Sequence, residues 1–562
     1  MPARTGGELV VASLLAQGAT HAFGVPGESY LAVLDALHDV GDRLRFVVCR
    51  HEGGAAYMGE AYGKLTGRPG VVLVTRGPGA SNAAIGIHTA AQDSTPLIVL
   101  IGQAGTDTLD REAFQEIDYC RMYGGSVKWA AQVDRVERIP EYMAQAFRRA
   151  MAGRPGPVVV ALPEDVLTAR ADAPDVARIE PIALAPAPRD VAATHALLGR
   201  ARAPLCIVGG RRWDAQACEA LRAFSDGTGM PVACAFRTQD TFDNRHPHYA
   251  GDVGIGINPR LAARVREADV LLVIGERLGE MTTSGYTLLE PPMPHQALIH
   301  VHPGAEEIGR VYQPAIGIVA TPGEFLDALD ASRLANDGWR AHARAAHADY
   351  EAWRTPRPAP GPVDAGVLVR VLDEQLPDDA IVTNGAGNYT VWLHRGYRFR
   401  RLGTQLAPYS GAMGYGVPAA VAAKALHPDR VVLSWNGDGC YLMNGQELAT
   451  AVQYGLGVIF VVMDNAMYGT IRMHQERTYP GRVSGTELRS PDFAALARAY
   501  GAMGETVRRT DEFAGALERA RAHAGPSVIH VIVDPQALTP NASLDALRAQ
   551  GMAARASSSA TA

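Results

Sequence analysis

The chain has 562 residues, of which 47% are apolar and 20% are charged, and its formal net charge at pH 7 is −6. This length predicts several domains with large cores, and the composition is that of an ordinary globular protein. Without a surplus of basic residues, we expect no binding to nucleic acid or to a membrane. No secretory segment precedes Leu9, no apolar run is long enough to cross a bilayer, and the six cysteines lack C-x-x-C spacing, so we expect a cytoplasmic protein with reduced thiols.

The first part of the chain, residues 1–170, is predicted to form an α/β domain. Apolar runs at 46–48, 71–75 and 96–103 predict strands. Glu52 follows the first strand, and a glycine loop follows the second and opens a helix predicted at about 83–91. An isolated glutamate at a strand end is usually solvated or caps a helix, so Glu52 by itself does not indicate a site.

A second α/β unit is predicted at 191–330, because strand-like runs at 205–208 and 270–274 are each followed by glycine. The preceding linker, 171–190, is rich in proline and alanine and suits an extended connector. A second proline-rich join covers 354–362. At the other end of the chain, residues 541–562 finish in small residues without an apolar period, and we expect a flexible tail there.

The most informative spacing lies in the third predicted unit, residues 363–540. Asp438, between two glycines, follows the apolar run 431–435, and Asn465 follows the run 458–463. The stretch between them predicts a helix with one apolar face, so the segment predicts a βαβ crossover whose two strands are parallel. Both polar side chains then lie at carboxyl ends of strands, where open α/β sheets bind ligands.

This arrangement suits a divalent ion that bridges a diphosphate. Mg²⁺ prefers oxygen ligands, which Asp438 and Asn465 offer, and Gly437 and Gly439 let the backbone approach phosphate oxygens. The alternative is a pair of ordinary turns that close two strands. The spacing and the strand context favour the diphosphate site.

With these segments the chain resembles the thiamine diphosphate-dependent enzymes of the acetolactate synthase and pyruvate oxidase superfamily. The family motif runs from Gly-Asp-Gly to a downstream Asn-Asn, and this chain has Asp464-Asn465 there, which keeps the ligand position. The resemblance implies an α/β fold of three doubly wound parallel-sheet domains. These are an N-terminal pyrimidine-binding domain, a central Rossmann-like domain and a C-terminal domain that binds the diphosphate and Mg²⁺.

The resemblance also implies roles for individual residues. Glu52 is the predicted catalytic residue: in a dry site it would hydrogen-bond the aminopyrimidine ring, whose imino nitrogen then removes the proton from the thiazolium carbon. The implied Mg²⁺ ligands are Asp438, Asn465 and the main-chain oxygen of Met467. Met413, which could otherwise simply fill the core, would hold the cofactor in its bent conformation. The remaining predicted cofactor contacts are Gly387, Asn388, Tyr389, Gly411, Gly437, Gly439, Cys440, Tyr468, Gly469 and Thr470.

Four positions bear on the substrate. Phe114 and Gln115 match residues that line the substrate channel in acetolactate synthases, although a helix turn with one buried Phe is the alternative. Met281 aligns with an arginine that holds the carboxylate of the acceptor, and a methionine cannot make that charged contact. His474 aligns with a tryptophan that favours the larger acceptor, and a histidine there could shuttle protons.

FAD stays an open question. Related enzymes bind it through the central domain, where the strand end 299–303 carries His300 and His302 in place of an acidic pattern that commonly takes the ribose hydroxyls. Gly209, Gly210 and Arg277 remain compatible with FAD.

The leading prediction is a carboligase that resembles acetolactate synthase, decarboxylates a 2-oxo acid such as pyruvate and transfers the carbanion to an acceptor. One alternative is a decarboxylase or lyase that releases an aldehyde, and another is a catalytically idle homologue that serves as a partner subunit. The resemblance implies a homodimer or homotetramer with its active site at the subunit interface.

Overall fold

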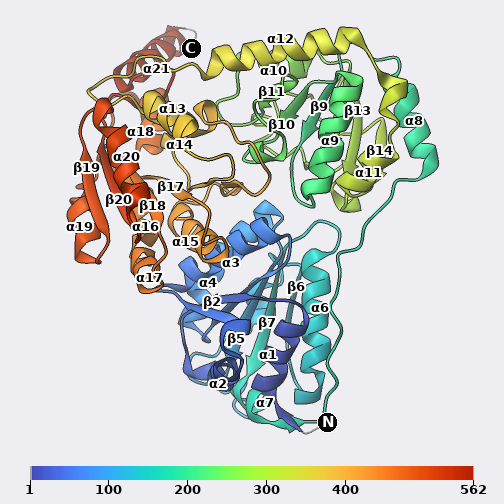
Figure 1. The fold of residues 1–562 in the computed structure, drawn as a ribbon, viewed down its shortest axis with the longest axis vertical. Coiled ribbons are helices and arrows are strands. Elements are labelled where there is room, and N and C mark those ends of the chain that lie inside the picture. The colour runs from blue at the N-terminus through green and yellow to red at the C-terminus, as the bar shows by residue number, and fades with distance from the viewer. Residues whose placement is uncertain (1–2, 561–562) are drawn as a thin grey trace. The chain divides into compact units, whose positions relative to one another are not determined.

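The computed structural model describes residues 3–560 and contains three six-stranded sheets, all parallel (Figure 1). Helices accompany each sheet, which confirms the predicted α/β class. The chain divides into two compact units, one of residues up to Ala183 with Val421–Leu426, and the other of Leu184–Ala420 with the residues from His427 onward. The first unit holds one of the six-stranded sheets and the second unit holds the other two. Within the described residues, no helix has the length and apolarity that crossing a membrane requires.

The first sheet has the strand order β3-β2-β4-β5-β7-β6. Every residue of β4, β5 and β7 is buried, as expected for parallel strands covered on both faces. Its strands are β2 (His21–Gly24), β3 (Arg45–Val48), β4 (Gly70–Val74), β5 (Leu97–Gln103), β6 (Trp129–Gln132) and β7 (Pro157–Pro163). The helices of this part are α1 (Gly6–Ala16), α2 (Leu31–Val40), α3 (Glu52–Thr66), α4 (Pro78–Asp93), α5 (Tyr119–Tyr123), α6 (Ile139–Met151) and α7 (Glu164–Thr168). Two short strands, β1 (Arg4–Thr5) and β8 (Arg170–Ala171), pair antiparallel.

The second sheet has the order β11-β10-β9-β12-β13-β14. Its strands are β9 (Leu205–Val208), β10 (Val232–Cys234), β11 (Tyr249–Asp252), β12 (Val270–Ile274), β13 (Ala297–His302) and β14 (Ile316–Val319). Its helices are α8 (Pro188–Leu198), α9 (Ala215–Thr228), α10 (Pro259–Glu267), α11 (Pro322–Ala328) and α12 (Asp337–Arg354). The strands predicted at 205–208 and 270–274 are β9 and β12.

The third sheet has the order β16-β15-β17-β18-β20-β19 and carries the predicted crossover. Its strands are β15 (Ile381–Asn384), β16 (Gln405–Leu406), β17 (Val432–Gly437), β18 (Val458–Asp464), β19 (Met503–Val507) and β20 (Ser527–Ile532). Its helices are α13 (Ala365–Gln375), α14 (Tyr389–Gly396), α15 (Gly416–Leu426), α16 (Asp438–Asn444), α17 (Leu448–Gln453), α18 (Gly469–Thr478), α19 (Phe493–Ala499), α20 (Phe513–Ala522) and α21 (Leu544–Ala560).

Strands β17 and β18 pair in parallel, as the crossover prediction requires, with Gly437 opposite Met463. The connection differs from the prediction of one helix, because α16 and α17 are separated by the 3₁₀ turn Gly445–Glu447. The glycine at this break lies under a ring: a Cβ on Gly445 would come within 2.8 Å of Tyr441. Helix α16 starts at Asp438, directly after β17, so this carboxylate lies at the carboxyl end of that strand.

The end of the chain also differs from the prediction. Residues 541–562 were expected to form a flexible tail, whereas Leu544–Ala560 forms helix α21, which packs on α18 (Figure 1); 561–562 lie outside the described residues. Two anchors, which the pattern of small residues does not reveal, hold this helix in place. Leu544 and Leu547 join a buried cluster with Met473 and Leu538. The second anchor is an ion pair between Arg548 and Glu476.

The buried Glu476 carboxylate accepts hydrogen bonds from Arg548 Nη2 at 2.9 Å and from Arg472 Nε at 2.9 Å. These partners, Arg548 first, lower the pKa of Glu476 to about 2. Gly551 lies so close that a Cβ would come within 2.1 Å of the Glu476 carbonyl oxygen. Charge pairing and close packing together explain why this segment folds.

Leu547→Ala should release α21 from α18. Leu547 is 1% exposed, and truncating a buried leucine costs about 2–5 kcal/mol. Because the cluster is small, we expect the low end, which corresponds to amide exchange in α21 about 30-fold faster. Hydrogen exchange followed by mass spectrometry measures this. Met552→Ala is the matched control because Met552 is 52% exposed, and its exchange should not change. Equal exchange in both variants would contradict the assigned anchor.

Candidate active site

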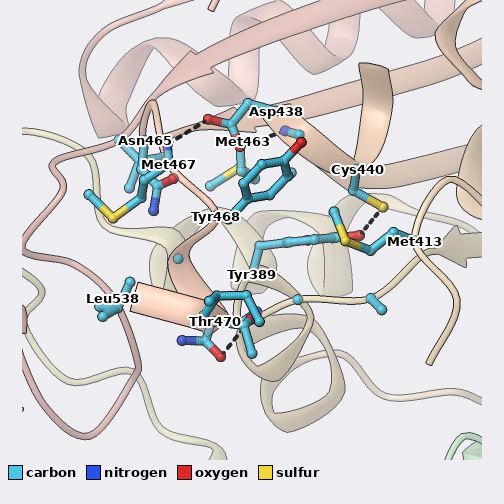
Figure 2. A pocket seen from close by; sticks show the side chains of 18 of the residues that line it. Tyr389, Met413, Asp438, Cys440, Met463, Asn465, Met467, Tyr468, Thr470 and Leu538 are labelled. Carbon is cyan, nitrogen blue, oxygen red and sulfur yellow. Dashed lines mark hydrogen bonds between the residues drawn. The ribbon is translucent and has the colours of Figure 1, made fainter. Parts of the chain in front are cut away.

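A cavity of about 240 Å³ lies in the second unit, at the carboxyl ends of β15, β17, β18 and β20. The structure brings together here every cofactor-contact position predicted from the sequence except Glu52. Figure 2 shows side chains from separate stretches of sequence directed toward one space, among them Tyr389, Met413, Asp438, Asn465 and Leu538. The predicted residues that line the cavity are Gly387, Asn388, Tyr389, Gly411, Met413, Gly437, Asp438, Gly439, Cys440, Asn465, Met467, Tyr468, Gly469 and Thr470.

Sequence reasoning missed the apolar wall of this cavity. The additional lining residues are Ala365, Ala386, Trp392, Met463, Ile471, Val533, Ala537 and Leu538. Met463 is the last apolar residue of its strand run, and Val533 directly follows β20, so the rule that ligands bind beyond strand ends could have indicated both. Trp392 and Leu538 carry no such signal, because ordinary core residues have the same composition.

Asp438 is almost completely buried at the first position of α16. Its Oδ1 accepts from the Gly439 N–H at 2.8 Å, and its Oδ2 accepts from the Met467 N–H at 3.2 Å. Burial raises the pKa of Asp438, and the nearby Asp464 carboxylate raises it further. A bare carboxylate is therefore unfavourable at this place, and a cation would relieve the cost.

The loop after β18 is held in one conformation by the backbone. Ala466 has a positive φ of 54°, which is uncommon for a residue other than glycine and persists only where the surroundings impose it. Its carbonyl accepts from the Leu488 N–H at 2.9 Å, and the Tyr468 N–H donates to the Thr486 carbonyl at 2.9 Å. Asn465 and the Met467 backbone are thereby placed beside Asp438.

Asp464, the residue that replaces the first asparagine of the family motif, is not among the residues that line the cavity and has hydrogen-bond partners of its own. His530 Nε2 lies 2.9 Å from its Oδ2, and Ser490 Oγ donates to its Oδ1 at 2.8 Å. These hydrogen bonds lower the pKa of Asp464 despite its partial burial. The acidic replacement is thus stabilised in its charged form by hydrogen bonds, and it supports the turn that presents Asn465 by accepting from the Ala466 N–H at 3.0 Å.

Two glycines make room for aromatic rings in the cavity wall. A Cβ on Gly437 would come within 2.8 Å of the Tyr389 ring, and one on Gly439 within 2.6 Å of the Tyr468 ring. Tyr389 reaches across the cavity and donates from its hydroxyl to Cys440 Sγ at 3.0 Å (Figure 2). Neither glycine could be replaced without moving a ring.

These residues fit a metal diphosphate. A buried carboxylate with a raised pKa, an amide side chain and a nearby backbone carbonyl form the oxygen donor set that Mg²⁺ prefers. On the opposite side, the Asn388 N–H donates to Thr470 Oγ1 at 2.8 Å, and the Thr470 hydroxyl donates to Asn388 Oδ1 at 3.0 Å. This polar pair offers hydrogen-bonding groups to phosphate oxygens.

In the first unit, Glu52 lies at the start of α3 and is half-buried. Its Oε2 accepts from Asn82 Nδ2 at 2.9 Å, and its Oε1 lies 3.3 Å from the position of a Cβ on Gly79. The carboxylate therefore sits against the glycine loop that follows β4. That loop begins α4 at Pro78, earlier than the predicted start near 83, because proline suits the first turn.

Phe114 and Gln115 approach the same loop within this unit. The Phe114 carbonyl accepts from Arg76 Nε at 3.0 Å, and Gln115 Cβ lies 2.7 Å from a Cβ position on Gly77. Phe114 is 71% exposed, which excludes the alternative of a buried core residue within this unit. Glu52, Phe114 and Gln115 thus surround the glycine loop.

The two acceptor positions do not line the cavity of the third sheet. Met281 is half-buried in the segment after β12, and His474 is exposed on α18. Ile471, three residues before His474 on the same helix, does line it. The cavity and the positions that would choose an acceptor are therefore distinct parts of the structure.

The chain matches models of a known protein family. Models of the thiamine pyrophosphate enzymes match three segments: the N-terminal TPP binding domain at residues 4–122, the central domain at 191–329 and the C-terminal TPP binding domain at 385–531. The chain belongs to the thiamine pyrophosphate enzyme family, which confirms the resemblance read from the motifs. It is therefore an enzyme of this cofactor class.

Individual proteins similar to the chain are acetolactate synthase large subunits. The chain is 33% identical to the acetolactate synthase isozyme 2 large subunit of Escherichia coli (strain K12) over 532 residues, covering 94% of this chain and 95% of that protein. It is also 33% identical to the acetolactate synthase large subunit of Corynebacterium glutamicum, covering 95% of this chain and 87% of that protein. Isozyme 3 of Escherichia coli (strain K12) is 32% identical, with 92% of each chain covered.

Proposed function

We propose that this chain is a carboligase of the acetolactate synthase type, which decarboxylates a 2-oxo acid such as pyruvate and transfers the resulting carbanion to an acceptor. The observation that carries the proposal is the cavity of the third sheet, which gathers every predicted cofactor contact except Glu52. Similarity to acetolactate synthases over nearly the whole chain supports carboligation. It favours neither an aldehyde-releasing lyase nor an idle partner subunit.

Within the proposed site, Asp438, Asn465 and the Met467 carbonyl hold Mg²⁺. The bound cofactor supplies the nucleophilic carbon and the electron sink for decarboxylation. Glu52 would hold a proton on the aminopyrimidine ring, and Met413 would support the cofactor from the cavity wall. The apolar wall excludes water, which strengthens the charge interactions within the site.

We propose that the chain does not bind FAD, because the strand end predicted to meet its ribose does not fit that role. His300 and His302 are almost completely buried. Nε2 of His300 lies 2.8 Å from the Glu276 carbonyl oxygen, and Nδ1 of His302 accepts from the Gly304 N–H at 2.9 Å. The Glu276 carboxylate also lies 2.8 Å from a Cβ position on Gly209. An absorption spectrum of the purified protein tests this, since flavin bands would contradict it.

We also propose a homodimer or homotetramer in which Glu52 of one subunit serves the cavity of its neighbour. Mixing Glu52→Gln and Asp438→Asn subunits tests it. In mixed dimers one of the two sites then receives both intact residues, so random exchange should restore about a quarter of wild-type activity. No recovery after exchange would place both residues in one subunit.

The direct test of the proposed function is product analysis. The protein, loaded with thiamine diphosphate and Mg²⁺, is incubated with a panel of 2-oxo acids, while CO₂ is followed and the carbon product is identified by mass. From pyruvate we expect one acetolactate per CO₂ released. An aldehyde as the main product would replace the proposal with the lyase alternative.

A further inference from the structure

A buried polar network joins the two sheets of the second unit. It consists of Gln239, from the segment between β10 and β11, and of Asn384, His394 and Gln405 from the third-sheet part. Their side chains are almost completely buried, with exposures of 0%, 0%, 9% and 4%. Buried polar groups are costly unless they are hydrogen-bonded, so such a network has to be geometrically well defined.

The Gln405 side-chain amide connects the first two members. Its Nε2 donates to Gln239 Oε1 at 3.0 Å and lies 3.2 Å from His394 Nδ1, while its Oε1 accepts from the Gln239 N–H at 2.7 Å. Gln239 Nε2 in turn donates to the His394 carbonyl at 2.8 Å. The amide therefore holds both Gln239 and the imidazole ring in place.

His394 links the two glutamine side chains to Asn384, at the edge of the cavity. Burial lowers the pKa of His394 to about 3, so the ring is neutral and has one N–H. Its Nδ1 lies 2.8 Å from Gln239 Oε1 and 3.2 Å from Gln405 Nε2, and its Nε2 lies 3.1 Å from Asn384 Oδ1, so the ring contacts all three amide side chains. Asn384 Nδ2 donates to the Gly385 carbonyl at 2.8 Å. Gly385 opens the loop whose next residues, 386–389, line the cavity.

The far end of the network is firmly attached. The buried carboxylate of Asp240, next to Gln239, accepts from three successive backbone N–H groups: Gly403 at 2.8 Å, Thr404 at 3.1 Å and Gln405 at 3.2 Å. At the cavity end of the network the loop that starts at Gly385 has little room to move, because a Cβ on Gly385 would lie 2.4 Å from Cys440 Sγ. A shift of the loop therefore changes the cavity directly.

We infer that His394 is a positioning residue for cofactor binding: it transmits the position of Gln239 and Gln405 through Asn384 to the loop 385–389. His394 is not among the residues that line the cavity, so it acts through the loop. The inference rests on the family's cofactor occupying this cavity, and it does not depend on which substrate the enzyme uses.

The test is calorimetric titration of thiamine diphosphate with Mg²⁺ into purified variants, at a temperature well below their unfolding. His394→Leu removes the polar contacts of the ring with Asn384 and the two glutamines at similar size, and we expect about 10-fold weaker binding, which corresponds to the loss of one hydrogen bond. His394→Gln can still donate and should recover most of the affinity. At saturating cofactor, the turnover of both variants should equal that of the wild type.

His248→Leu is the matched control. His248 is also buried, with Nδ1 3.1 Å from Ser225 Oγ, and its replacement should lower the unfolding temperature without changing cofactor affinity. If His394→Leu fails to fold, Gln239→Met tests the network from its far end, with an expected loss of about threefold. Wild-type affinity in a folded His394→Leu or Gln239→Met would overturn the inference. Failure of the wild type to bind thiamine diphosphate would instead overturn the proposed function.

Discussion

Glu52→Gln should lower cofactor-dependent CO₂ release by about 10²–10⁴-fold, the range that a positioned proton-transfer group contributes. Glutamine keeps the size of the side chain and its hydrogen bond with Asn82. It cannot exchange a proton with the aminopyrimidine ring, so the step that activates the cofactor fails. The measurement is the initial rate of CO₂ release from pyruvate at saturating cofactor.

Glu52→Gln should lower the rate of CO₂ release and not the affinity for the cofactor. Thiamine diphosphate should still bind Glu52→Gln within a few-fold of the wild type, because the diphosphate and metal contacts come from the other unit. Glu180→Gln is the control, since Glu180 is 66% exposed in the same unit, and its rate should not change. Undiminished CO₂ release from Glu52→Gln would remove Glu52 from the catalytic role.

Asp438→Asn should abolish Mg²⁺-dependent cofactor binding. Loss of a residue that only supports a metal ligand commonly weakens metal binding about 10–100-fold, so removal of a charged ligand should cost at least about 100-fold. The expected readout is a calorimetric titration with no measurable heat at cofactor concentrations that saturate the wild type. Asp511→Asn, at a site 69% exposed, should bind normally.

The same substitution distinguishes a metal-binding role of the Asp438 carboxylate from a purely structural role. Because burial raises the pKa of Asp438, an uncharged amide removes the cost of a buried charge, which offsets the loss of one acceptor for a backbone N–H, and the cofactor-free protein should stay about as stable as the wild type. A structural role predicts the opposite, namely a lower unfolding temperature without cofactor. Unchanged cofactor affinity in Asp438→Asn would contradict the proposed metal site.

The strands could be predicted from the sequence because parallel strands covered on both faces are continuous apolar runs. Strands β4, β17 and β18 lie where such runs predicted them. The helix between β17 and β18 was less accessible to prediction. Its break at Gly445 depends on a contact with Tyr441 that the apolar period does not reveal.

Helix α21 shows what pattern reasoning misses at a chain end. Its sequence is dominated by small residues, and its stability depends on tertiary contacts of Leu547 and Arg548 with α18. Such contacts override weak local signals. The cavity follows the same rule: glycines and polar residues at strand ends were predictable, whereas Trp392 and Leu538 depend on how distant segments meet.

The network around His394 could not be predicted from the sequence either. Gln239 and His394 are 155 positions apart, and nothing in their spacing relates them. A histidine inside a helix is commonly a satisfied buried polar group. Only the structure shows that its partner Asn384 ends the strand that leads into the cavity loop.

The central claim is that the cavity of the third sheet holds thiamine diphosphate through a divalent metal. The most direct measurement is calorimetric titration of the metal-stripped wild-type protein with thiamine diphosphate and with thiamine, each in the presence and absence of Mg²⁺. We predict saturable binding of thiamine diphosphate only with Mg²⁺, and binding of thiamine weaker by at least about 100-fold, because the metal and the loop act on the diphosphate. Equal binding of the two compounds, or binding independent of Mg²⁺, would contradict this account.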